Sequence, residues 1–146
     1  MSRRKSREFA MQLIYQIEMR SGDDLKDQLE LAFEENERDY TQTDRAYIEN
    51  VVYGVFSNLE ELDSVVRNNA KGWKLTRIAK IDLSILRLCI YEIKYRDDIP
   101  FNISINEAIE LAKKYGAEES GSFINGILSK AVPPETASNI KFDREK

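Results

Sequence analysis

The chain contains no histidine and only one cysteine, Cys89. Without histidine it cannot form a Ser–His or Cys–His catalytic pair, or any imidazole metal site. A single cysteine excludes an intramolecular disulfide and any cysteine cluster for zinc or iron–sulfur. The six glycines never form the GxGxxG or P-loop patterns that cradle phosphates. We therefore expect no catalytic residue, no metal and no cofactor.

Long apolar runs are also absent. No segment approaches the roughly 18 apolar residues that a membrane-spanning helix needs. The basic start followed by an apolar stretch resembles a signal peptide only superficially, because Gln12, Gln16 and Glu18 interrupt the stretch. The length of 146 residues favours one domain with a core of its own. We expect a cytoplasmic protein.

The net charge of -4 is unevenly distributed along the chain. Residues 1–20 carry five basic and two acidic residues, and residues 64–96 carry eight basic and two acidic residues. Residues 21–63 carry three basic and thirteen acidic residues. Such segregation indicates a local anion-binding site or a chance difference between helices, and charge alone leaves both open.

Apolar residues recur with helical spacing along almost the whole chain, and no stretch sustains the alternation of a half-buried strand. The sequence predicts an all-α domain of about seven helices over residues 1–133. A polar C-terminal tail is expected over residues 134–146. Breaks between helices are expected near residues 21–23, 57–58, 72, 97–100, 116 and 133–134.

Several single residues carry local predictions. Ser104 and Glu107 have the spacing of a capping box at the start of a helix. Trp73 is expected to plug a junction, and Cys89 to be a buried, inert thiol. Gly126 interrupts an apolar helical pattern, which indicates a close contact with another helix.

The basic N-terminus has a pattern that suits RNA. On a helix, Arg3, Arg4 and Arg7 fall within an arc of about 100°, and Met11 and Tyr15 continue the same stripe. Arginine binds phosphates with two parallel hydrogen bonds, and aromatic rings stack on bases. A basic helix end that is merely solvated explains the same residues equally well.

Three segments are distinctive: SRRKSREFAMQLIY over residues 2–15, IDLSILRLCIYEIKYRDDIP over 81–100 and INEAIELAKKYGAEESGSFINGILSKA over 105–131. Together they resemble the family of bacterial transcription antitermination factors NusB, and the second segment matches the long central helix of the family and its stop. The resemblance implies two three-helix bundles and a non-enzymatic role. It also implies that the protein pairs with NusE, a ribosomal protein that doubles as a transcription factor. The pair would bind single-stranded boxA RNA of nascent ribosomal RNA transcripts and, with NusA and NusG, help RNA polymerase resist termination.

The resemblance also implies roles for residues at matching positions. Tyr15 and Asp82 fall where the family meets NusE. The positions implied to contact RNA are Arg3, Arg4, Lys5, Arg7, Gln12, Glu119, Ser122 and Phe123.

Two of these positions differ from what an RNA surface favours. Ser122 stands where relatives often have a basic residue, and Glu119 would repel phosphate, which limits RNA affinity until NusE adds contacts. Two alternatives are a helical interaction scaffold without RNA and an accessory module of a ribosomal RNA methyltransferase. The sequence also leaves open whether the protein alone is a monomer or a homodimer.

Overall fold

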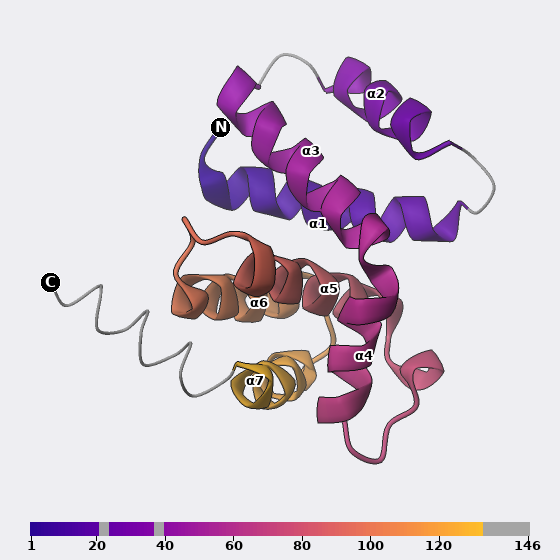
Figure 1. Cartoon of the computed structure of the whole chain (residues 1–146), viewed down its shortest axis with the longest axis vertical. Helices are drawn as coiled ribbons and strands as arrows, with labels where there is room; N and C mark the ends of the chain where they lie inside the picture. Colours follow the sequence, from indigo (N-terminus) through magenta and orange to yellow (C-terminus); the bar gives the residue numbers. More distant parts are fainter. Residues whose placement is uncertain (21–23, 37–39, 133–146) are drawn as a thin grey trace, which may run out of the picture. The chain divides into compact units, whose positions relative to one another are not determined.

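The computed structural model describes residues 1–20, 24–36 and 40–132. Within those residues the chain forms seven α-helices and one 3-10 turn, and no strand. Internal contacts divide it into two compact units, Met1–Asn58 (unit 1) and Leu59–Lys146 (unit 2). The prediction of an all-α fold with about seven helices is confirmed (Figure 1). Instead of two three-helix bundles, unit 1 has three helices and unit 2 has four. No helix of the described part is long and apolar enough to cross a membrane.

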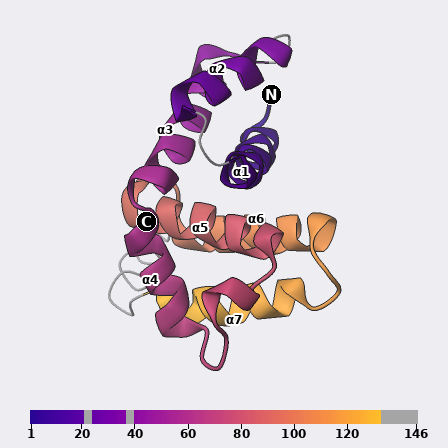
Figure 2. The same ribbon diagram turned by 90° about the vertical axis from the view of Figure 1, so that its right-hand side faces the viewer.

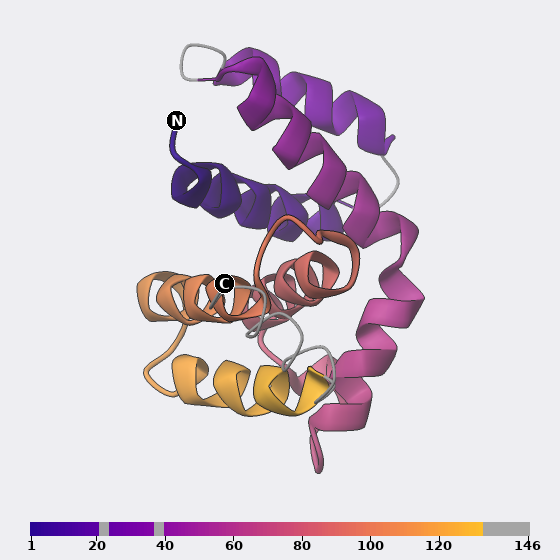
Figure 3. The ribbon, with the colours of Figure 1, turned by 60° about the vertical axis from the view of Figure 1, so that its left-hand side comes forward.

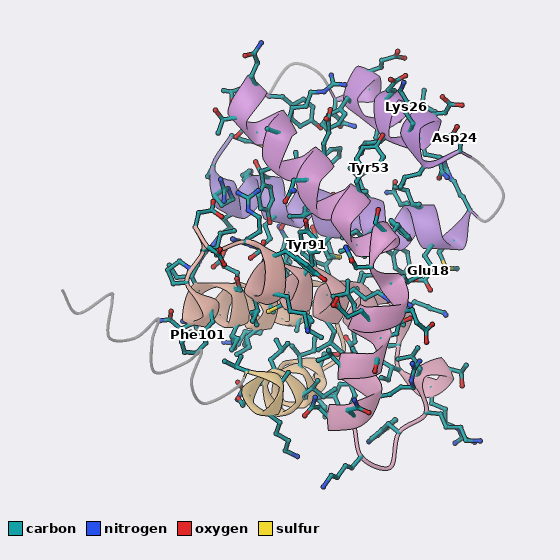
Figure 4. All side chains as sticks on the ribbon, viewed as in Figure 1. Glu18, Asp24, Lys26, Tyr53, Tyr91 and Phe101 are labelled. Atoms are coloured by element: carbon teal, nitrogen blue, oxygen red, sulfur yellow. The ribbon has the colours of Figure 1, made fainter. Side chains whose placement is uncertain are left out.

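Unit 1 contains α1 (Arg3–Met19), α2 (Leu25–Glu35) and α3 (Gln42–Ser57). α1 packs mainly against α3, and Figure 2 shows α1 nearly end-on beside it. Asp24 caps α2 by accepting a hydrogen bond from the Lys26 backbone N–H at 2.8 Å (Figure 4). Thr41 and Asp44 form a capping box that begins α3. These caps satisfy backbone donors that have no partner inside their helices.

Unit 2 contains α4 (Leu59–Asn69), the 3-10 turn η2 (Leu75–Arg77), α5 (Lys80–Tyr95), α6 (Phe101–Tyr115) and α7 (Ser120–Ala131). α5 is the central helix, and every residue from Asp82 to Glu92 is buried. α5, α6 and α7 pack on one another, as Figure 3 shows. The buried Arg87 side chain forms two hydrogen bonds with Asp63, at 2.8 and 2.9 Å, and so links α5 to α4.

Two local predictions hold. α3 ends at Ser57 and α4 begins at Leu59, so the expected bend at residues 57–58 is confirmed. Cys89 is buried in α5, as expected. The turn expected at residues 21–23 and the tail expected over 134–146 lie outside the described residues.

The capping box predicted at Ser104 is wrong. α6 begins earlier, at Phe101, with Pro100 at its N-cap. Ser104 therefore lies inside the helix, where its buried hydroxyl donates to Glu92 Oε1 at 2.7 Å. Proline suits the start of a helix because it lacks the N–H that would have no partner there. The serine thus serves a contact between helices.

Two other predictions about packing are wrong. Trp73 is 53% exposed, so it is not a buried plug, although its ring contacts Phe123 of α7. A Cβ added to Gly126 would meet no atom within 4 Å, so this glycine allows no close contact between helices. Both predictions assumed that a conspicuous residue is buried, whereas both residues face outward.

Candidate nucleic-acid interface

The start of α1 is fixed by polar contacts with α3. Ser2 caps α1, since its Oγ accepts a hydrogen bond from the Lys5 backbone N–H at 3.1 Å. Asp44 of α3 accepts from the N-terminal ammonium at 2.9 Å and from Ser6 Oγ at 3.4 Å. The ammonium and the backbone N–H of Thr41 lower the Asp44 pKa to about 2. The first turn of α1 is therefore held in a defined position.

That first turn presents Arg3, Arg4 and Lys5 to solvent, and we call these three residues the basic turn. The guanidinium carbon of Arg3 lies 4.4 Å from the centre of the Tyr47 ring, a cation–π distance. Because Tyr47 is only 2% exposed, it orients Arg3 without offering a stacking surface to a base. The basic turn can bind phosphates.

The predicted solvent-facing stripe does not continue beyond the basic turn. Arg7 is 4% exposed, with its guanidinium carbon 5.9 Å from the Tyr47 ring centre, and Met11 is fully buried. The prediction placed the buried face of α1 on one side of the helix only, whereas α1 also buries the side that carries Arg7 and Met11. Farther along α1, Gln12 and Tyr15 are partly exposed.

Unit 2 holds a pocket of about 240 Å³ around Asp82. This Asp82 pocket is lined by Trp73, Arg77, Ile78, Ala79, Asp82, Ala117, Glu119, Ser120 and Phe123. Two regions that are distant in the sequence build it: residues 73–82, which lead into the first turn of α5, and residues 117–123, at the start of α7. It therefore joins Asp82, expected at a protein contact, to Glu119 and Phe123, expected at RNA.

Asp82 has an incomplete set of hydrogen bonds. It lies in the first turn of α5 and is 7% exposed. Its Oδ2 accepts a hydrogen bond from Ser120 Oγ at 3.1 Å, but Oδ1 has no partner among the described residues. Burial raises the pKa of Asp82 above its usual value, although the Ser120 hydrogen bond acts in the opposite direction. A buried acceptor without a partner is suited to receive a donor from a ligand.

Ser120 is positioned by the tight turn between α6 and α7. Its Oγ accepts a hydrogen bond from the Ala117 backbone N–H at 2.9 Å while it donates to Asp82. Gly116 makes this possible, because a Cβ at that position would lie 2.6 Å from Ser120 Oγ. The geometry of the turn thus fixes one side of the Asp82 pocket.

Ser122 is separated from the other predicted residues of α7. It lines a different hollow, of about 270 Å³, together with residues of α6 that include Ile109 and Lys113. Glu119 is exposed at the N-cap of α7, and its side chain makes no capping hydrogen bond. The structure thus brings Asp82, Glu119 and Phe123 together and leaves Ser122 apart.

Six lining residues of the Asp82 pocket were not predicted as site residues, and three of them carry polar or aromatic side chains: Trp73, Arg77 and Ser120. Trp73 had a visible signal, since it is the only tryptophan and follows Gly72, but burial was the wrong inference from it. Ser120 had none, because its partner Asp82 lies 38 residues away.

Comparisons with known proteins agree on one family. A model of the NusB family matches residues 4–133. The transcription antitermination protein NusB of Acetivibrio thermocellus is 57% identical over 132 residues, which cover 90% of this chain and 89% of that protein. The structure of T. maritima NusB superposes with a TM-score of 0.84 at 33% identity, covering 94% of this chain and 98% of that one.

A structure of NusB and NusE in complex with dsRNA is similar in fold, with a TM-score of 0.78 at 23% identity. The match covers 88% of this chain and 94% of that chain. Both the sequence match and the fold extend over most of the chain. The chain belongs to the NusB family.

Proposed function

We propose that this chain is a non-enzymatic, cytoplasmic adaptor of transcription antitermination that binds single-stranded boxA RNA together with NusE. The observation that carries the proposal is the exposed basic turn, Arg3, Arg4 and Lys5, in a chain that matches the NusB family from residue 4 onward. In the larger complex it acts with NusA, NusG and RNA polymerase.

The basic turn suits RNA phosphates for three physical reasons. Its side chains are exposed, its backbone is held by the contacts of Ser2 and Asp44, and it lies at a helix N-terminus. Backbone N–H groups and the helix dipole both favour anions at such a terminus. Arg7 contributes from within the protein, where its contact with Tyr47 supports the position of the turn.

Unit 2 carries further proposed contacts of its own. Phe123 is half-exposed and offers a ring to a base, since single-stranded RNA is read through splayed and stacked bases. Asp82, with one buried oxygen lacking a partner, is proposed to accept a hydrogen bond from NusE. Tyr15 of α1 and Gln12 are proposed contacts to NusE and to RNA respectively.

The test is fluorescence anisotropy of a labelled boxA RNA and of a scrambled RNA, with and without NusE. We expect NusE to tighten binding to boxA but not to the scramble. Three phosphate contacts predict a log–log salt slope of about -2, so affinity falls roughly 15-fold between about 50 and about 200 mM salt. The triple variant Arg3→Ala/Arg4→Ala/Lys5→Ala is expected to lose most of this salt dependence.

A matched control keeps the test specific. Lys26→Ala/Lys113→Ala/Lys130→Ala removes the same charge from other exposed positions and is expected to leave RNA binding unchanged. Arg7 is left intact, because a variant of this buried residue would also disturb folding. Equal losses in both triple variants, or equal binding of boxA and scramble with NusE present, would refute the proposal.

A further inference from the structure

The chain between α4 and α5 carries a dense positive charge. Residues 71–80 include Lys71, Lys74, Arg77 and Lys80 and no acidic residue. All four basic side chains are exposed. We call residues 70–79 the Trp73 loop. The charge of residues 71–80 is complementary to a polyanion, and none of the four basic residues belongs to the proposed RNA contacts of α1 and α7.

Trp73 stands in the middle of this loop with more than half of its surface exposed. It is nevertheless held in place. Its backbone N–H donates to the Ala70 carbonyl at 3.0 Å, directly after Gly72, which has a φ of +82°. Its ring packs edge-on against Phe123, with ring centres 5.5 Å apart and planes at 64°. An exposed but positioned indole is suited to stack on a flat ligand.

The distribution of charged residues around Trp73 indicates where RNA phosphates would bind. Asp82 and Glu119 lie inside the Asp82 pocket and repel phosphate there, and Arg77 lines the same pocket. Lys71 and Lys74 flank Trp73 in the sequence and do not line that pocket. A nucleic-acid strand would therefore follow the two lysines on the outer side of the loop.

We propose that the Trp73 loop is a further single-stranded RNA contact, in which one base stacks on Trp73 and flanking phosphates bind Lys71 and Lys74. The inference rests on the proposed function, since it extends the RNA surface outward from Phe123. Lysines next to an exposed aromatic ring are the combination that single-strand binders use, because the basic side chains bind the phosphates while a base stacks on the ring. Stacking of this kind tolerates any base, so the loop adds affinity without sequence preference.

The sole tryptophan allows a direct test, because all indole emission of the chain comes from Trp73. Titration with unlabelled boxA RNA is expected to quench this emission, with the same midpoint as anisotropy of labelled RNA. Trp73→Leu is expected to weaken binding about fivefold to a hundredfold, and by the same factor for boxA and for scrambled RNA. Tyr95→Leu, which removes a similarly exposed ring of unit 2, serves as the control.

The lysines are tested by the salt dependence of binding. With the two lysines added to the three contacts of the basic turn, the log–log salt slope becomes about -3.5, and Lys71→Gln/Lys74→Gln is expected to reduce its magnitude by about 1.4. Lys113→Gln/Lys130→Gln removes the same charge from exposed positions of α6 and α7 and is expected to leave the slope unchanged. Circular dichroism checks that each variant keeps its helices.

The outcomes separate this inference from the proposed function. If boxA RNA binds but indole emission does not change and Trp73→Leu binds normally, the Trp73 contact is refuted while the adaptor function stands. If no RNA binds with or without NusE, the proposed function fails first. If NusE alone changes the emission and RNA does not, the Trp73 loop contacts protein and the inference is overturned.

Discussion

Gly116→Ala is expected to destabilise unit 2 by about 2 kcal/mol. The added Cβ would lie 2.6 Å from Ser120 Oγ, 2.7 Å from Ser120 Cβ and 2.8 Å from the Ala112 carbonyl oxygen. Overpacking of this kind costs about 1–3 kcal/mol, and loss of a Ser120 hydrogen bond adds about 1 kcal/mol. Alanine also lowers the conformational entropy of the unfolded chain, which offsets about 0.5–1 kcal/mol of this destabilisation.

Urea unfolding followed by circular dichroism measures this effect. With a slope of about 2 kcal/mol per molar urea, the midpoint should fall by about 1 M. Gly126→Ala is the matched control, because a Cβ there meets nothing within 4 Å and the residue lies inside α7. That substitution should raise stability by about 0.5–1 kcal/mol.

Opposite signs for the two glycines are the essential result. If Gly116→Ala leaves the midpoint unchanged, the turn between α6 and α7 yields easily and does not fix Ser120. If Gly126→Ala destabilises the protein, that glycine has a packing role that its surroundings do not show. The same Gly116→Ala variant should weaken the effect of NusE on RNA binding, because it displaces the hydroxyl that binds Asp82.

Four further predictions concern charged residues. Asp63→Ala should cost about 3–5 kcal/mol in urea unfolding, because the buried Arg87 loses its carboxylate, and Asp63→Leu/Arg87→Met should recover most of that loss; a single variant costing under about 1 kcal/mol would contradict this. The lowered pKa of Asp44 stabilises the fold above about pH 4. Stability should fall as pH drops from about 4 to about 2, less steeply in Asp44→Asn, and parallel curves would refute the assignment. The raised pKa of Asp82 has the opposite effect on stability, because ionising this buried carboxyl destabilises the fold as pH rises above about 4. The stability of Asp82→Asn relative to the native chain should therefore increase with pH above about 4. A constant difference between about pH 4 and about pH 7 would argue against this assignment. Glu119→Gln should tighten boxA binding about two- to fivefold by removing one repulsive charge, and an unchanged dissociation constant would dismiss that role.

The helices could be predicted well because their signals are local. Apolar spacing indicated each of them, and breaks such as Ser57 with Asn58 or the glycine at 72 are properties of the chain itself. Ser104 shows the limit of such signals. Its spacing to Glu107 satisfies a capping rule, yet its hydroxyl binds Glu92, a residue of another helix. Whether a serine caps or connects depends on packing that the local pattern does not contain.

The candidate site could be predicted only in part for the same reason. The basic turn was visible because three adjacent basic residues are seldom buried together in a core. Arg7 has the same chemistry, but it is buried beside Tyr47, a residue 40 positions later in the sequence. Whether a basic residue is exposed depends on how the helices pack. The composition of the sequence therefore identified the basic segment but not which of its residues are exposed to solvent.

The Asp82 pocket shows why a buried acid can be a functional signal. Burial disfavours the charged carboxylate, and the single hydrogen bond from Ser120 compensates only part of that cost. An isolated fold gains nothing from an oxygen that is buried and lacks a donor, since an apolar residue of similar size would fill the space more favourably. A ligand that donates a hydrogen bond to Oδ1 would remove this cost of burial. The free energy of binding would become more favourable by the same amount. The aromatic pair of Trp73 and Phe123 beside the carboxylate adds surface that can be covered at the same time. Unit 2 is thus less stable alone than its packing would allow, and the deficit lies where we propose that NusE and RNA bind.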